Sequence, residues 1–169
     1  MRTIARSVGT ALIAAACLTA PALAKEPEGL PPASVDAIVA AVDACRAART
    51  QHRTDVAILT QRGFARATFS NAQGKRSQTP PKMFSRDGAL ILVPPDENGC
   101  VVMANLTASS DWMVLNAKLN TALGATPFET RLGEAAWRVG GQYLRLDATG
   151  SREKPGVRVF VALSDRDRK

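Results

Sequence analysis

The chain has 169 residues, of which 46% are hydrophobic and 22% charged, and its formal net charge is +7 at pH 7. These values exclude collagen-like, low-complexity and wholly disordered chains, since each of those classes departs strongly from the average composition of globular proteins. The length suits one modest domain. Composition therefore indicates a globular protein, but it assigns no activity.

The first 24 residues have the organisation of an export signal. Arg2 and Arg6 precede an uncharged stretch with an apolar centre, and Ala22, Leu23 and Ala24 form the small-x-small pattern that a signal peptidase accepts. We predict cleavage after Ala24 and a periplasmic or secreted mature protein. Cleavage removes two basic residues and no acidic ones, which lowers the net charge from +7 to +5.

The same segment has two alternative interpretations. An uncleaved anchor is disfavoured because the stretch is barely long enough to span a bilayer and contains Pro21. A lipoprotein would carry its lipid on Cys17, but Ala14 occupies the position where such signals usually have a leucine-like residue.

Beyond the signal, the sequence divides into three predicted parts. Residues 25–32 are rich in proline and charge and are predicted to be a leader segment. A single folded domain is predicted over residues 33–163. Residues 164–169 are predicted to be a charged tail.

The domain is predicted to open with a helix capped by Ser34. Apolar residues recur along it at helical spacing and form one stripe; they are Val35, Ile38, Val42 and Cys45. Cys45 is therefore expected to point into the protein.

Four strands are predicted after this helix. Residues 55–60 and 64–70 form the first pair, around a glycine-containing turn. Residues 89–93 and 100–106 form the second pair, and the prolines, asparagine and glycine between them strongly favour a turn. Between the two pairs, residues 71–82 are polar and are predicted to be an exposed loop.

A second helix is predicted to begin after Ser109 or Ser110 and to end at Gly124. One broad face carries its large and apolar residues: Trp112, Leu115, Leu119, Ala122 and Leu123. Three strands follow, over residues 135–139, 142–147 and 157–163. Gly140-Gly141 suits a two-residue hairpin turn, and the last strand alternates apolar residues in a way that predicts one buried face.

The predicted order is thus helix, four strands, helix, three strands. Short turns favour antiparallel neighbours, and two amphipathic helices can cover one face of the resulting sheet. The sequence therefore predicts a two-layer α+β domain with an antiparallel sheet. The order resembles two unequal halves, each a helix followed by a meander, although no residue-level repeat accompanies it.

After cleavage, Cys45 and Cys100 are the only cysteines. An oxidising compartment favours a disulfide between them, and their positions on a helix face and at a strand start indicate a structural role. The alternative is a pair of separately buried thiols. A reactive cysteine is disfavoured because neither residue has CxxC spacing or a basic, histidine-rich setting.

The basic residues support one binding hypothesis. Arg46, Arg49 and Arg53 recur near the end of the first predicted helix, and Lys75 and Arg76 lie in the predicted loop. They form a candidate site for an anionic polymer or membrane surface, although arginines at a helix end are also explained by the helix dipole. Nucleic acid is not an expected partner after export, and the aromatic residues of a single-strand binder are missing.

The inventory of reactive residues disfavours the familiar enzyme classes. His52 is the only histidine, and no zinc, nucleophile-elbow, phosphate-loop or dinucleotide motif occurs, so no metal or cofactor is expected. A Cys100 nucleophile with His52 as its base would need a free thiolate. Glycoside hydrolysis would need two carboxylates across a cleft. The candidate carboxylates are Asp96, Glu97, Asp111, Glu129 and Glu134.

A non-enzymatic role in the envelope fits these observations best. We expect a module that binds a protein partner or serves an assembly as an accessory, through exposed loops on a rigid sheet. The alternatives are a binder of anionic envelope polymer or lipid headgroups and a small hydrolase with an unrecognised site. A partner-binding module should expose an apolar patch ringed by polar residues, a polyanion binder a contiguous basic surface, and an enzyme a cleft with converging titratable groups.

Export is expected to leave a mature protein that starts at Lys25, because the charged start, apolar centre and cleavage site occur in the required order. N-terminal sequencing and the intact mass of the exported protein measure this directly. Retention of Met1, or a lipid on Cys17, would contradict it.

Overall fold

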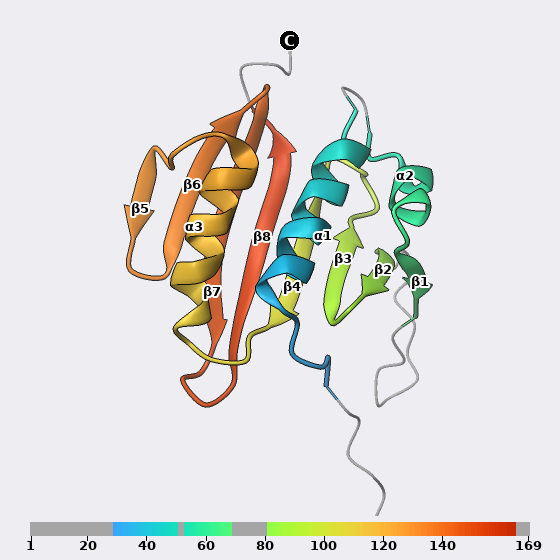
Figure 1. The fold of residues 1–169 in the computed structure, drawn as a ribbon. Coiled ribbons are helices and arrows are strands. Elements are labelled where there is room, and N and C mark those ends of the chain that lie inside the picture. Colours follow the sequence, from blue (N-terminus) through green and yellow to red (C-terminus); the bar gives the residue numbers. More distant parts are fainter. Residues whose placement is uncertain (1–28, 51–52, 69–80, 165–169) are drawn as a thin grey trace, which may run out of the picture.

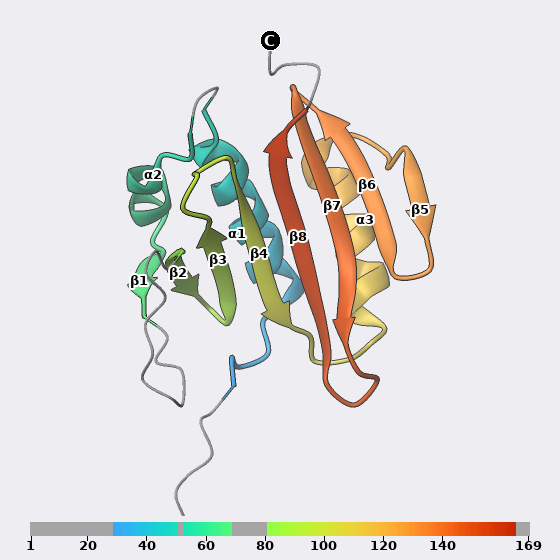
Figure 2. The same cartoon turned by 180° about the vertical axis from the view of Figure 1, so that it is seen from behind.

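One antiparallel sheet of eight strands forms a layer of the protein, and the helices form a second layer on one of its faces (Figures 1 and 2). This computed structural model describes residues 29–50, 53–68 and 81–164. The helices are α1 (Val35–Ala48), α2 (Val56–Gln61) and α3 (Asp111–Leu123). The strands are β1 (Ala65–Ala67), β2 (Lys82–Arg86), β3 (Ala89–Val93), β4 (Gly99–Asn105), β5 (Glu129–Arg131), β6 (Glu134–Val139), β7 (Gln142–Gly150) and β8 (Pro155–Leu163). The predicted α+β class and antiparallel sheet are confirmed.

The sheet joins two meanders of four strands. Its strand order is β1-β2-β3-β4-β8-β7-β6-β5, so β4 and β8 meet at the centre and β1 and β5 form the two edges. The hairpins β2–β3 and β6–β7 occupy equivalent places in the two halves. Both turn through two residues with positive φ, Asp87-Gly88 at 49° and 80° and Gly140-Gly141 at 55° and 73°, as a type I′ turn requires. The two halves therefore share a connectivity, and α2 is an addition to the first.

Helix α1 is bound to the centre of the sheet by a disulfide. The Ser34 hydroxyl accepts a hydrogen bond from the Ala37 amide at 3.1 Å and so caps the helix as predicted. Ile38, whose side chain is fully buried, belongs to the apolar stripe that packs on the sheet, and each large side chain buried in this way contributes about 1.5–3 kcal/mol. Cys45, on the same stripe, is joined to Cys100 on β4, with 6.2 Å between their Cα atoms. The predicted disulfide is confirmed.

The face of the sheet that meets the helices is apolar throughout its centre. Its alternate residues on β3, β4, β8, β7 and β6 are buried: Ile91, Val93, Cys100, Val102, Val157, Val159, Val161, Leu144, Leu146, Ala135 and Trp137. The predicted alternation along β8 is therefore confirmed. The described helices lie on this face. Because successive side chains of a strand point to opposite faces, the intervening residues of the same strands point to the side of the sheet away from these helices.

Helix α3 covers the second half of the sheet (Figure 1). Leu115, Leu119 and Leu123 are buried, whereas Ala122, which was predicted on the same face, is exposed. The helix ends at Gly124 as predicted, and this glycine has the left-handed φ of 61°. The Trp137 indole on β6 donates to the Asn120 side-chain oxygen at 2.8 Å, which fixes α3 over that strand.

The prediction of a strand over residues 55–60 is wrong, because this segment forms α2. The Asp55 carboxylate accepts from the Ala57 amide at 3.0 Å and caps the helix. Val56, Ile58 and Thr60 are β-branched at every second position, which mimics a strand, but only Leu59 of this helix is buried. Gly63, with φ of 83°, follows the helix end instead of turning a hairpin.

Three further strands differ from the prediction. Strand β1 is shorter than expected. Strand β2 was not predicted, because residue 82 was assigned to the exposed loop and residues 83–86 to no strand. Strand β5 was not predicted either. Its three residues are all exposed and carry no alternating pattern. The described order is therefore helix, helix, four strands, helix, four strands, and none of these helices is long and apolar enough to cross a membrane.

Replacing both cysteines with alanine is expected to lower the free energy of unfolding by about 4 kcal/mol, because the bridge closes a loop of 55 residues in the unfolded chain. Urea unfolding of the purified protein measures the difference. Reduced wild type is the matched control and should approach the variant in stability. Peptide mapping without reduction should recover the linked pair, and two freely alkylated thiols would contradict the bridge.

Candidate functional site

The structure separates the three arginines that were predicted to bind anions. Helix α1 ends at Ala48, so only Arg46 lies on it. The Arg46 guanidinium donates from Nε to the Gln142 side-chain oxygen at 3.1 Å, and the Gln142 amide donates back to the Arg46 carbonyl at 3.0 Å. Arg49 is buried, and Arg53 is exposed beyond the helix end. The three residues therefore form no single exposed stripe. The other two candidates, Lys75 and Arg76, lie outside the described residues.

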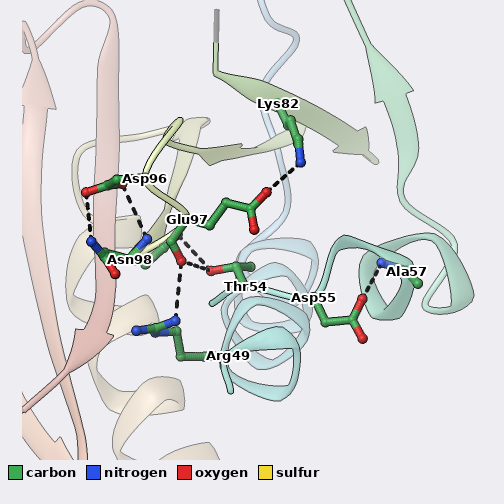
Figure 3. A network of polar contacts seen from close by, with 9 residues as sticks. Arg49, Thr54, Asp55, Ala57, Lys82, Asp96, Glu97 and Asn98 are labelled. Atoms are coloured by element: carbon green, nitrogen blue, oxygen red, sulfur yellow. Dashed lines mark hydrogen bonds and ion pairs between the residues drawn. The ribbon is translucent and has the colours of Figure 1, made fainter. Parts of the chain in front are cut away.

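Arg49 belongs to a polar network that supports the fold (Figure 3). Its Nη1 donates to the Glu97 carbonyl at 3.3 Å. The same carbonyl accepts from the Thr54 amide at 3.0 Å and lies 3.1 Å from the Thr54 hydroxyl. Because Glu97 lies in the turn just before Cys100, the network ties this turn to the segment after α1. The burial of Arg49 thus has a structural explanation.

The carboxylates proposed for acid and base chemistry do not meet across a cleft. Asp96 accepts from the amide and the side chain of Asn98, and Asp111 accepts from the Ala108 amide. Within the described residues, no group of three or more histidines, cysteines, aspartates or glutamates could hold a metal. Cys100 is bonded to Cys45 and cannot supply a thiolate, so the hypothesis of a Cys100 nucleophile is wrong. His52 lies outside the described residues.

A groove of about 320 Å³ lies between α1 and α3. Its lining combines apolar side chains with a charged rim: Asp36, Val39, Ala40, Val42, Asp43, Arg46, Leu119, Ala122 and Leu123. Both acids of the rim are engaged, Asp36 with Lys118 and Asp43 with Arg62. This groove therefore holds no converging set of catalytic groups.

The side of the sheet that faces away from the helices is the strongest candidate for a binding surface (Figure 2). We call it the open face. Cross-strand pairing arranges its side chains in two central rows. One row is Met83, Leu92, Val101, Phe160, Arg145 and Ala136; the other is Ser85, Leu90, Met103, Arg158, Asp147 and Glu134. Both rows carry apolar residues on β3 and β4 and a charged residue on β7. Met83 extends the apolar part to β2 in the first row, and Glu134 extends the charged part to β6 in the second.

The apolar part of the open face is partly exposed to solvent. Met103 and Phe160 retain 38% and 43% of their accessible surface, and Met83, Leu92 and Val101 are half-buried. We call these five residues the apolar patch. They lie on four neighbouring strands of one sheet, so the patch is contiguous, unlike the single exposed apolar residues that most protein surfaces carry.

Ion pairs hold the charged part of the open face in place beside this patch. Asp147 is buried between two arginines, with its Oδ1 2.6 Å from the Arg145 Nε and its Oδ2 2.9 Å from the Arg158 Nη2. Arg145 also contacts Glu134 at 3.3 Å. The hydrogen bond to Asp147 raises the pKa of Arg145 above its ordinary range. The Arg158 guanidinium lies 6.0 Å from the centre of the Phe160 ring, which joins the charged part to the patch.

The sequence indicates only part of this surface. Alternation along β8 indicates that Arg158 and Phe160 share the face opposite the core valines. It does not show which residues of other strands lie beside them, because that depends on pairings between distant segments. Comparison of the chain with protein-family models, with curated proteins and with solved structures found no match.

The ion pair between Glu97 and Lys82 is expected to make stability depend on pH. The hydrogen bond from Lys82 lowers the pKa of Glu97 below its ordinary value of 4.5, and the charges of Lys82 and Arg53 act in the same direction, against burial. A lowered folded-state pKa contributes stability that is present above about pH 4.5 and is lost as the pH falls through the folded-state value. E97Q should therefore be less stable than wild type at neutral pH.

Urea unfolding at a series of pH values measures this effect, and the difference between wild type and E97Q should shrink as the pH falls below about 4. K82M is the matched control. In a K82M background, E97Q should change the acid dependence little. A difference between wild type and E97Q that stays constant with pH would show that the ion pair is not its cause.

Proposed function

We propose that the protein is an exported, non-enzymatic module that binds a protein partner or serves an assembly, and that the apolar patch on its open face is the contact surface. One observation supports this most strongly: a contiguous apolar patch on a sheet face lies beside arginines that are fixed by ion pairs. An apolar centre with a polar rim is the usual anatomy of a protein–protein interface.

The charged residues beside the apolar patch are arranged in a way that lowers the entropic cost of binding. Arg145 and Arg158 are held by the buried Asp147, so they lose little side-chain freedom when a partner covers them. Met103 and Phe160 are the most exposed side chains of the apolar patch. Aromatic residues and arginines are enriched among the residues that dominate binding energy at interfaces.

The two alternatives receive less support from the geometry. Anion binding by the arginines after α1 would need a contiguous basic surface, yet Arg49 is buried and Arg46 is engaged with Gln142. A hydrolase would need converging titratable groups, and the groove between α1 and α3 offers none within the described chain.

Photo-crosslinking in intact cells tests the proposed surface. A photoreactive phenylalanine analogue in place of Phe160 should form covalent adducts with the partner. The same analogue in place of Met113 is the control, since Met113 is 66% exposed but lies on α3 in the other layer. Adducts from position 160 should fall sharply when M103E is added, because a carboxylate would have to be desolvated at the centre of the contact.

Melting temperatures of the purified variants show whether the fold is intact. Equal adduct yields from positions 113 and 160, or adducts from position 160 that M103E leaves unchanged, would contradict the proposal.

A further inference from the structure

We infer that the partner of the open face is a second copy of this chain, which packs face to face and forms a symmetric dimer. This inference rests on the proposed function, because it identifies what covers the apolar patch. It is supported by the size of the face, by the distribution of large and small side chains along it, and by the order of charges on β6.

The open face has the size that a stable interface needs. Eight strands about 4.8 Å apart, with an average length of about 20 Å, give a face of about 750 Å². Specific interfaces bury about 800 Å² on each partner. A second copy offers a face of the same size and the same twist. Two such sheets would pack at the spacing of about 10 Å that is usual for sheets stacked face to face.

The rows of the open face define one favourable orientation. Apolar residues meet apolar residues when the two copies are related by a two-fold axis that lies midway between the two sheets. This axis is parallel to both sheets, crosses the strands, and follows the row of Val101 and Phe160. In this orientation the strands of the two sheets run antiparallel, and the row on one side of the axis covers the partner's row on the other side of the axis. Val101 and Phe160 then meet their own counterparts near the axis.

Large side chains meet small ones in the same orientation. On β4, Met103 lies two residues from Val101 on one side and Gly99 on the other, so Met103 of one copy faces Gly99 of the other. On β8, Arg158 and Ala162 flank Phe160 in the same way and face each other across the dimer. The glycine and the alanine leave room for the longer side chains opposite, which allows the two faces to approach closely.

Charges on β6 are also complementary under this operation. Glu134 and Arg138 lie on either side of Ala136, and all three belong to the open face. Turning the second copy places Glu134 of one chain opposite Arg138 of the other, and symmetry creates this contact twice. Both side chains are long enough to accommodate the angle of about 30° between aligned sheets.

Both residues have the capacity for this contact. The Arg138 guanidinium lies 4.6 Å from the centre of the Phe128 ring, and no carboxylate of the described chain pairs with it. Glu134 contacts Arg145 through Oε1 only, which leaves Oε2 for the second copy. Two charged residues of the axis row meet their own counterparts in this arrangement, Arg145 on β7 and Glu129 on β5. Within each chain, Asp147 and Glu134 offset the charge of Arg145, and Arg131 offsets the charge of Glu129.

Charge reversal on β6 gives a test that is specific to this geometry. Sedimentation of the exported protein over a concentration series should show a dimer for wild type. E134R and R138E should each weaken the dimer by about 100-fold, because each places two like-charge contacts in the interface. An equimolar mixture of E134R and R138E should dimerise again, since every contact between the two variants pairs opposite charges.

Control variants separate this geometry from general effects on folding or solubility. M113E, on α3, should leave the dimer unchanged, and F160E should abolish it. The double reversal E134R/R138E in one chain should keep the dimer. Circular dichroism and melting temperatures establish that each variant is folded.

A wild type that stays monomeric, or a mixture of E134R and R138E that fails to associate, would overturn the dimer. Adducts from position 160 that contain a different protein and are suppressed by M103E would also overturn it, but the proposed function would stand. Loss of both the dimer and the position-160 adducts would remove the proposed function as well.

Discussion

The hydrogen-bonded seam between β4 and β8 is the constraint on which the rest of the structure depends. It pairs seven residues of each strand and joins the two meanders into one sheet. It also aligns the valines of β8 with Cys100 and Val102, so that α1 packs over both halves at once. The disulfide reinforces this centre, because it attaches α1 to one strand of the seam. A change that weakened the seam would therefore affect the sheet and the helix layer together.

The number of helices explains why one face of the sheet has no helix layer among the described residues. Residues 29–50, 53–68 and 81–164 include two long helices, and a helix with its side chains is only about 10 Å wide, roughly two strand spacings. Both helices pack on the face of the sheet that carries the buried valines and leucines. The opposite face retains Met103 and Phe160 at its centre, and buried Asp147 holds the neighbouring arginines. Stability and surface chemistry are thus divided between the two faces of the same strands.

Local patterns in the sequence were sufficient to predict four features of the fold. These are the apolar stripe of α1, the end of α3, the alternation along β8 and the α+β class. They failed where tertiary contacts overrode them. Val56, Ile58 and Thr60 alternate like a strand, yet the Asp55 cap and burial of Leu59 make the segment helical. Strand β5 has no pattern, because an edge strand of three exposed residues needs none. The open face was beyond local reasoning, because its rows come from pairings between segments more than 50 residues apart.

The short edges of the sheet have a consequence for how this protein avoids aggregation. An exposed edge strand offers unpaired backbone groups to any other strand, and repeated pairing of that kind has no natural end. Here both edges are strands of three residues, β1 and β5, and β5 carries charged residues at both ends. Lateral growth of the sheet would therefore gain few hydrogen bonds. A sheet whose edge strands are this short can keep an apolar face at its centre without becoming a template for fibrils.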